Sequence, residues 1–140
     1  MRRAALLLVA LGLLFGLAAC GSGTIVAPTG KVIGTLPSGG KGNAADGKKL
    51  YASLGCQGCH TLEGAKSVGP TFKGLYNSER KLTDGSTVTA DDAYLLQSIT
   101  DPDKQIVAGF QPGVMSSVIK PGQVSPSDAK SLVEFIKTVK

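Results

Sequence analysis

The sequence predicts an all-α fold of three main helices with short loops between them. Three segments, 47–54, 89–99 and 125–139, place apolar residues at helical spacing beside helix start or stop signals. The strand signal is a hairpin turn at Asp84-Gly85, whose arms are too short to form more than a stub. The globular domain is expected to run from Ala45 to Lys140, enough chain for one small core.

The first predicted helix leads directly into a pair of cysteines. Gly47, Leu50, Tyr51 and Leu54 fall at offsets of 0, 3, 4 and 7, which places them on one face of a helix. The helix is expected to end at Gly55, because glycine commonly follows the last helical turn. Whatever the cysteines bind therefore lies at the C-terminal end of this helix.

Two further helices begin at recognisable capping residues. Thr89 followed by Asp92 is a capping box for the second helix, which Pro102 ends. Its apolar face consists of Leu95, Leu96 and Ile99. Ser125 followed by Pro126 at the first helical position starts the third helix. Its apolar face consists of Leu132, Phe135, Ile136 and Val139.

The N-terminal segment begins with two basic residues and a long apolar stretch. Arg2 and Arg3 precede residues 4–19, a stretch shorter than the roughly 20 residues that span a bilayer. It ends Leu17-Ala18-Ala19-Cys20, which resembles a bacterial lipobox. We expect residues 1–19 to be a signal peptide and Cys20 to become the lipid-modified mature N-terminus. An uncleaved membrane anchor is the alternative.

The segment 20–44 is rich in Gly, Ser, Thr and Pro and has no sustained helical or strand period, which predicts a flexible tether. Removing residues 1–19 takes away two of the 15 basic residues and none of the 10 acidic ones, so the net charge falls from +5 to +3. This small charge, without a basic run or aromatic–basic alternation, argues against nucleic-acid binding. The lysines are more consistent with one docking face for a protein.

The chemistry of the chain is concentrated in Cys56-Gln57-Gly58-Cys59-His60. This is the C-x-x-C-H pattern of c-type haem attachment, in which two thiols add to the haem vinyl groups and the histidine ligates iron. The spacing has a mechanical reason: two cysteines one turn apart reach vinyls on neighbouring pyrroles, and the next residue lies beneath the metal. One covalently bound haem c is therefore expected.

Three other interpretations of the cysteine pair are weaker. A thioredoxin-like motif requires a surrounding βαβ pattern, which is missing from the sequence, and a structural zinc site requires four ligands. Cys20 is assigned to the lipid and His60 is the one histidine of the chain, so no second ligand pair is left. A disulfide between Cys56 and Cys59 would close a very tight loop and leave His60 without a role.

The second axial ligand is expected to be Met115. A protein that transfers electrons usually fills both axial positions of its haem iron. Apart from the initiator, Met115 is the one methionine, and it lies in the Gly/Pro-rich loop 109–115, where ordinary core filling is less expected. Thioether plus imidazole ligation raises the potential relative to two imidazoles, so we expect a positive midpoint potential. The other ring nitrogen of His60 needs an acceptor, and Gly69-Pro70 is positioned to offer a backbone carbonyl.

At these residues the chain resembles a class I cytochrome c, and the resemblance extends from Ala45 to Lys140. The run 69–76, the Asp84-Gly85 turn, Tyr94-Leu95, Asp101-Pro102 and the run 109–112 are similar to the cytochrome c domain of caa3-type oxidase subunit II and to small free-standing lipoprotein relatives.

The resemblance implies further contacts inside the domain. It implies that the first and last helices cross near Gly47, with Tyr51 and Phe135 packed at the crossing, and that Tyr76 and Arg80 hydrogen-bond the haem propionates. One departure is that Ser116 follows Met115, where the related domains usually have proline, which predicts a looser loop.

The resemblance also implies a function. We expect a lipid-anchored carrier of single electrons between respiratory or photosynthetic complexes, on the outer face of a bacterial cytoplasmic membrane or its periplasmic side. Its partners would be a quinol-oxidising complex, such as alternative complex III, and a terminal oxidase. A haem enzyme or gas sensor with an openable sixth iron position is one alternative, and a structural haem subunit of a larger complex is another. The absence of a second histidine and the presence of Met115 argue against the enzyme.

Overall fold

A computed structural model of the chain describes residues 24–26, 32–35 and 41–140. The predicted signal peptide and Cys20 lie outside these residues. The chain divides into two units, Met1–Leu36 and Pro37–Lys140. Within the part of the chain that is described, no helix is long and apolar enough to cross a bilayer.

The first unit contains a short antiparallel ladder that the sequence does not predict. Strand β1 (Thr24–Val26) pairs with β2 (Val32–Thr35), with Thr24 opposite Thr35. β-Branched residues in both segments favour extended backbone, but three or four residues are too few to produce a visible alternation. The tether over 20–44 stays a prediction.

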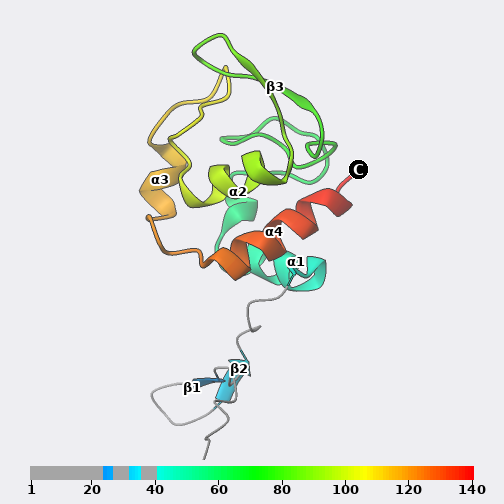
Figure 1. The fold of residues 1–140 in the computed structure, drawn as a ribbon, viewed down its shortest axis with the longest axis vertical. Helices are drawn as coiled ribbons and strands as arrows, with labels where there is room; N and C mark the ends of the chain where they lie inside the picture. The colour runs from blue at the N-terminus through cyan, green and yellow to red at the C-terminus, as the bar shows by residue number, and fades with distance from the viewer. Residues whose placement is uncertain (1–23, 27–31, 36–40) are drawn as a thin grey trace, which may run out of the picture. The chain divides into compact units, whose positions relative to one another are not determined.

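The second unit is predominantly helical, which confirms the predicted fold class (Figure 1). In chain order, its elements are α1 (Ala44–Ser53), the 3₁₀ turn η1 (Cys56–Gly58), β3 (Glu79–Lys81), β4 (Thr87–Thr89), α2 (Asp92–Thr100), α3 (Val114–Val118) and α4 (Pro126–Thr138). The three expected helices are α1, α2 and α4. The fourth helix, α3, is not predicted, because five residues are too few for a periodic apolar face.

Helices α1 and α4 cross closely at Gly47 (Figure 1). A Cβ atom at Gly47 would lie 1.9 Å from the carbonyl oxygen of Ser131, so only a residue without a side chain allows this approach. Beside it, the rings of Tyr51 and Phe135 pack with their centroids 5.4 Å apart. The crossing implied by the family resemblance is therefore confirmed.

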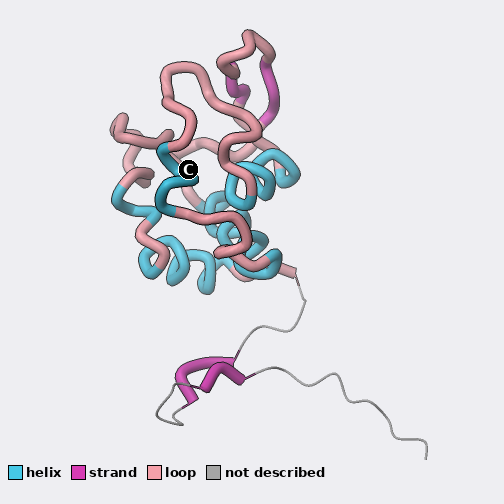
Figure 2. Tube along the Cα trace, turned by 90° about the vertical axis from the view of Figure 1, so that its left-hand side faces the viewer, coloured by secondary structure: helices cyan, strands magenta, loops and turns pink. Residues whose placement is uncertain are grey.

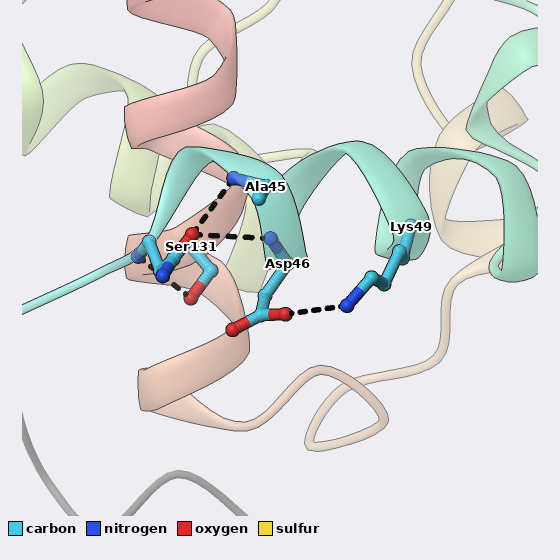
Figure 3. Close-up of polar contacts among 5 residues, drawn as sticks. Ala45, Asp46, Lys49 and Ser131 are labelled. Atoms are coloured by element: carbon cyan, nitrogen blue, oxygen red, sulfur yellow. Dashed lines mark hydrogen bonds and ion pairs between the residues drawn. The ribbon is translucent and has the colours of Figure 1, made fainter.

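The N-terminus of α1 is held by its own cap and by α4 (Figure 3). The Asn43 side chain accepts hydrogen bonds from the backbone N–H groups of Ala45, at 2.8 Å, and Asp46, at 3.3 Å. The backbone N–H of Asn43 donates to Ser131 Oγ at 3.2 Å. This last hydrogen bond joins two residues that are 88 positions apart in the chain, and it ties the N-terminus of α1 to α4.

The other two long helices begin at side-chain caps. For α4 the expected cap is confirmed: Ser125 Oγ accepts from the Asp128 N–H at 3.2 Å, and Pro126 is the first helical residue. For α2 the expected cap was wrong. The N-cap is Asp91, which accepts from the Tyr94 N–H at 2.8 Å, because Thr89 belongs to β4 and lies opposite Glu79.

The predicted hairpin stub is present as β3 and β4, which lie toward the end of the unit away from α1 (Figure 2). The loop after α2 runs along it. The Thr83 N–H donates to the Ile106 carbonyl at 2.8 Å, and the Ala108 N–H donates to the Lys81 carbonyl, also at 2.8 Å. The loop that leads to Met115 is therefore fixed to the hairpin by backbone hydrogen bonds.

Candidate functional site

The two cysteines and His60 are presented on one tight turn after α1. Gly55 ends the helix with a φ of +75°, a conformation that favours glycine. The N–H groups of Cys59 and His60 then both donate to the Cys56 carbonyl, at 3.1 and 2.9 Å. Both cysteines are half-buried free thiols, as thioether formation requires, and burial raises the pKa of the Cys56 thiol.

The imidazole of His60 is held from three directions. Its Nδ1 lies 2.8 Å from the Pro70 carbonyl oxygen, which confirms the expected acceptor. The ring stacks on Phe72 with centroids 4.8 Å apart and an interplanar angle of 23°. Gly69 lies against the ring, where a Cβ atom would be 2.5 Å from Cε1. Because Nδ1 donates to a carbonyl, Nε2 is the nitrogen left to bind a metal.

Burial and hydrogen bonding act in opposite directions on this imidazole. Burial lowers the pKa of His60 below its ordinary value, and the hydrogen bond to the Pro70 carbonyl raises it by a smaller amount. The net effect favours the neutral ring. A neutral imidazole is the form in which histidine binds metals.

A short backbone ladder positions the Gly69-Pro70 turn beside His60. The Gly69 N–H donates to the Cys59 carbonyl at 2.9 Å, and the Phe72 N–H donates to the Thr61 carbonyl at 2.8 Å. On the other side, the Tyr51 hydroxyl donates to the backbone carbonyl of His60. Hydrogen bonds from α1 and from the 69–72 segment therefore fix the backbone on both sides of the histidine.

An apolar cavity opens beside this turn. It consists of two adjoining pockets that share eight lining residues. We call their union the central cavity. The residues that line both pockets are Leu54, Cys56, His60, Pro70, Tyr94, Ser98, Met115 and Ile119. Cys59 lines one of the pockets.

Met115 approaches the central cavity from α3. The sequence places it in a loop; the structure places it on the first turn of this short helix, two residues after Gly113, whose φ is +79°. The side chain is half-buried and packs against the core. His60 and Met115 thus line the same cavity from segments more than fifty residues apart in the chain.

The residues of the central cavity fit a haem. A porphyrin needs an apolar slot, two thiols at its edge and a metal ligand on each face, and these side chains are gathered here. In addition, the Ser98 hydroxyl is buried and has no hydrogen-bond partner among the described residues. A buried polar atom of this kind commonly faces a group that the protein binds.

Two expected haem neighbours do not line the central cavity. Lys137 Nζ lies over the Tyr76 ring, 5.1 Å from the ring centroid, and the Tyr76 hydroxyl hydrogen-bonds to Asp92. Arg80 lies on β3, where its Nε is buried and has no partner among the described residues. Neither residue is part of either pocket's lining. Their role toward the propionates stays a prediction.

Several cavity residues were not identified from the sequence. Tyr94 and Ser98 are four residues apart on α2 and so share one helical face, a spacing that could have identified them. Phe72, which stacks on His60, has no such signal, because it comes from an irregular loop. Among the described residues, no group of three or more His, Cys, Asp or Glu side chains is placed to hold a metal ion.

Comparison with known proteins places this site in context. Residues 44–140 match the family model described as Cytochrome c. The cytochrome c2 iso-1 of Magnetospirillum fulvum is 30% identical over 95 residues, which cover 61% of this chain and 91% of that protein. The cytochrome c2 iso-2 of Magnetospirillum molischianum is 28% identical over 95 residues with the same coverage. The solved structure of cytochrome cH from Methylobacterium extorquens is matched with a TM-score of 0.49 at 28% identity, over 69% of this chain and 99% of that one.

Proposed function

The chain belongs to the cytochrome c family, and on this premise we propose that it carries electrons while held by a lipid on Cys20 at the outer face of a bacterial cytoplasmic membrane. It is a monohaem electron carrier with one covalent haem c, and it is not an enzyme. The membrane anchor is supported by the signal-peptide layout of residues 1–19 and the lipobox-like run before Cys20. A diacylglyceryl group supplies two chains, enough for stable anchoring.

Cys56 and Cys59 would hold the haem through thioether bonds, and His60 and Met115 would bind its iron. The observation that carries this assignment is that all four side chains line one apolar cavity. The bound haem supplies one-electron exchange between ferrous and ferric iron. The protein contributes an oriented neutral imidazole, a soft thioether and the exclusion of water, which together favour the reduced state and a positive potential.

The partners are proposed to be a quinol-oxidising complex as donor and a terminal oxidase as acceptor. The runs 69–76 and 109–112 support a relation to the cytochrome c domain of caa3-type oxidase subunit II. Residues 20–44 would act as the tether that lets the domain reach neighbouring complexes. In this proposal the chain delivers its electron to a separate protein.

The proposed docking face is framed by Lys48, Lys49, Lys66 and Lys73. All four are exposed, and Lys49 forms an ion pair with Asp46 at 3.1 Å. An acidic partner would be steered to such a face, and its rate of electron transfer would fall as salt screens the attraction. A rate that does not change with ionic strength would exclude this docking mode.

The site assignment is tested by spectroscopy and mass. The intact mature protein should exceed the mass of its polypeptide and lipid by one haem. The oxidised protein should show the red-region absorption band of methionine bound to iron, and Met115→Ala should abolish this band. Ser117→Ala, exposed on α3 and outside the lining of the central cavity, should retain it. Unchanged spectra for Met115→Ala would remove Met115 from the site.

The anchor is tested separately. Cys20→Ser should move the haem-containing protein from the membrane fraction to the soluble fraction and remove the lipid mass, with the visible spectrum unchanged. The mass of each protein also reports whether residues 1–19 were removed, which separates retention by an uncleaved apolar segment from retention by lipid. Membrane association of a Cys20→Ser protein that lacks residues 1–19 would contradict the lipid assignment.

A further inference from the structure

We propose that Asp103 is a positioning residue that holds Met115 toward the iron; this rests on the proposed role of Met115 as a ligand. The carboxylate of Asp103 accepts hydrogen bonds from residues on both sides of Met115 in the chain. Its Oδ1 accepts from the Gly113 N–H at 2.7 Å, and its Oδ2 accepts from Ser116 Oγ at 2.6 Å. The two hydrogen bonds bracket Met115, one two residues before it and one immediately after.

Helix α3 needs support from outside itself. It has five residues, far fewer than an isolated helix needs to be stable. Gly113 at its N-terminus has no side chain to cap it, and its φ of +79° leaves the entry to the helix dependent on other contacts. Asp103 takes up the Gly113 N–H and places a negative charge beside the start of the helix. Both bonds are short, as charge-assisted hydrogen bonds are.

Ser116, the residue after Met115, takes part in this contact through its hydroxyl group. The family resemblance leads one to expect proline after the ligand methionine, and its replacement predicts a looser loop. The structure provides a polar substitute, because the Ser116 hydroxyl reaches the Asp103 carboxylate that also holds Gly113. Rigidity that a proline ring would supply locally is here supplied by a residue thirteen positions away in the chain.

Asp103 is itself held in place. The loop that carries it is bonded to the hairpin through Thr83–Ile106 and Ala108–Lys81, and Leu82 forms a bridge with Val107. The carboxylate therefore projects from a segment tied to β3, and α3 is fastened to that segment.

The test measures how readily an external ligand replaces Met115. Added imidazole binds the oxidised protein only when the methionine arm is open, so its affinity reports the open population. Asp103→Ala should raise the open population and weaken the red-region band. Because the imidazole affinity rises in proportion to the open population, we expect an increase of about tenfold. Asp103→Asn retains one acceptor oxygen and Ser116→Ala removes one bond, so both should show smaller increases.

Asp84→Ala is the matched control. The Asp84 carboxylate also accepts two hydrogen bonds, from the Ser86 N–H at 2.9 Å and Ser86 Oγ at 2.6 Å, but it lies in the hairpin turn and does not line the central cavity. Its imidazole affinity should equal that of the unmodified protein. An equal increase in Asp84→Ala and Asp103→Ala would show general loosening and overturn the proposal.

The remaining outcomes separate the two assignments. If Met115→Ala abolishes the red-region band while Asp103→Ala, Asp103→Asn and Ser116→Ala all bind imidazole as the unmodified protein does, Met115 is the ligand and Asp103 does not position it. If Met115→Ala retains the band, the ligand assignment itself fails. Should Asp103→Ala not fold, Asp103→Asn and Ser116→Ala still decide the question.

Discussion

A Cβ atom at Gly69 would lie 2.5 Å from Cε1 and 2.8 Å from Nδ1 of His60. The imidazole therefore rests directly on the backbone of Gly69, while the ring of Phe72 covers it at a centroid distance of 4.8 Å. The histidine has one orientation between these two surfaces, and that orientation directs Nδ1 to the Pro70 carbonyl.

Gly69→Ala should displace the imidazole and weaken its hydrogen bond to Pro70. We expect a loss of about 1–3 kcal/mol in the free energy of unfolding, as overpacking typically costs, together with a change in the midpoint potential. Guanidinium unfolding and potentiometric titration measure the two effects. Lys66→Ala, exposed three residues upstream, should change neither. A Gly69→Ala protein with unaltered potential would show that the ring does not depend on this contact.

Gly47→Ala should destabilise the domain even though alanine is the better helix former. The propensity gain is about 1 kcal/mol, but the new methyl group would meet the Ser131 carbonyl oxygen at 1.9 Å, which forces α1 and α4 apart. We expect a net loss of about 1–3 kcal/mol by thermal or denaturant unfolding. Lys48→Ala, exposed on the same helix, should stay within about 0.5 kcal/mol. A stabilised Gly47→Ala protein would be incompatible with the close crossing.

Asn43→Ala should lower stability by about 1 kcal/mol, because it removes the acceptor for the Ala45 and Asp46 N–H groups. Asn43→Asp keeps a side-chain acceptor at the same place and should retain most of the stability. The denaturant midpoint of the haem-loaded protein is the measurement. Equal losses for both variants would assign the effect to something other than the cap.

Asp92 should contribute to the acid sensitivity of the fold. The hydrogen bond from Lys137 Nζ, at 2.7 Å, and then the Tyr76 hydroxyl hold the pKa of Asp92 below its ordinary value. A lowered folded pKa means that the stabilisation is present above the unfolded pKa of about 3.9 and is lost as the pH falls through the folded value.

The size of this effect is small, because the Asp92 side chain is 54% exposed and Lys137 also pairs with Glu134 at 2.8 Å. Asp92→Asn should therefore cost less than about 1 kcal/mol at pH 7 and lose less stability than the unmodified protein between pH 7 and 3. Urea midpoints at the two pH values give the comparison. Asp101→Asn, exposed at the end of α2, is the control, and a parallel acid response in all three proteins would disprove the role of Asp92.

The sequence was most informative at positions where the residue type allows few local structures. The Gly47 face of α1 and the Ser125-Pro126 start of α4 each predicted a feature that the structure contains. The C-x-x-C-H run predicted one covalent haem c, in agreement with the family match. These signals depend on local geometry, so neighbouring residues are enough to recognise them. The acceptor for His60 could also be predicted, because Pro70 closes a turn next to the only histidine.

The features that were not predicted depend on contacts between distant segments. Helix α3 has no periodic face, and its hydrogen bonds to Asp103 join residues ten and thirteen positions apart. The choice of Asp91 over Thr89 as the cap of α2 follows from the pairing of β4 with β3, which local propensity does not reveal. Tyr76 lies with Lys137 and Asp92 for the same reason, since α4 brings the lysine to it.

Tyr51 contacts both the crossing of α1 with α4 and the turn that carries His60. Its ring packs between Phe72 and Phe135, and its hydroxyl donates to the backbone carbonyl of His60. Separation of α1 from α4 would therefore displace the backbone of the histidine that is proposed to bind the haem iron. An absorbance trace recorded during heating would therefore follow the helix pair and the haem environment together.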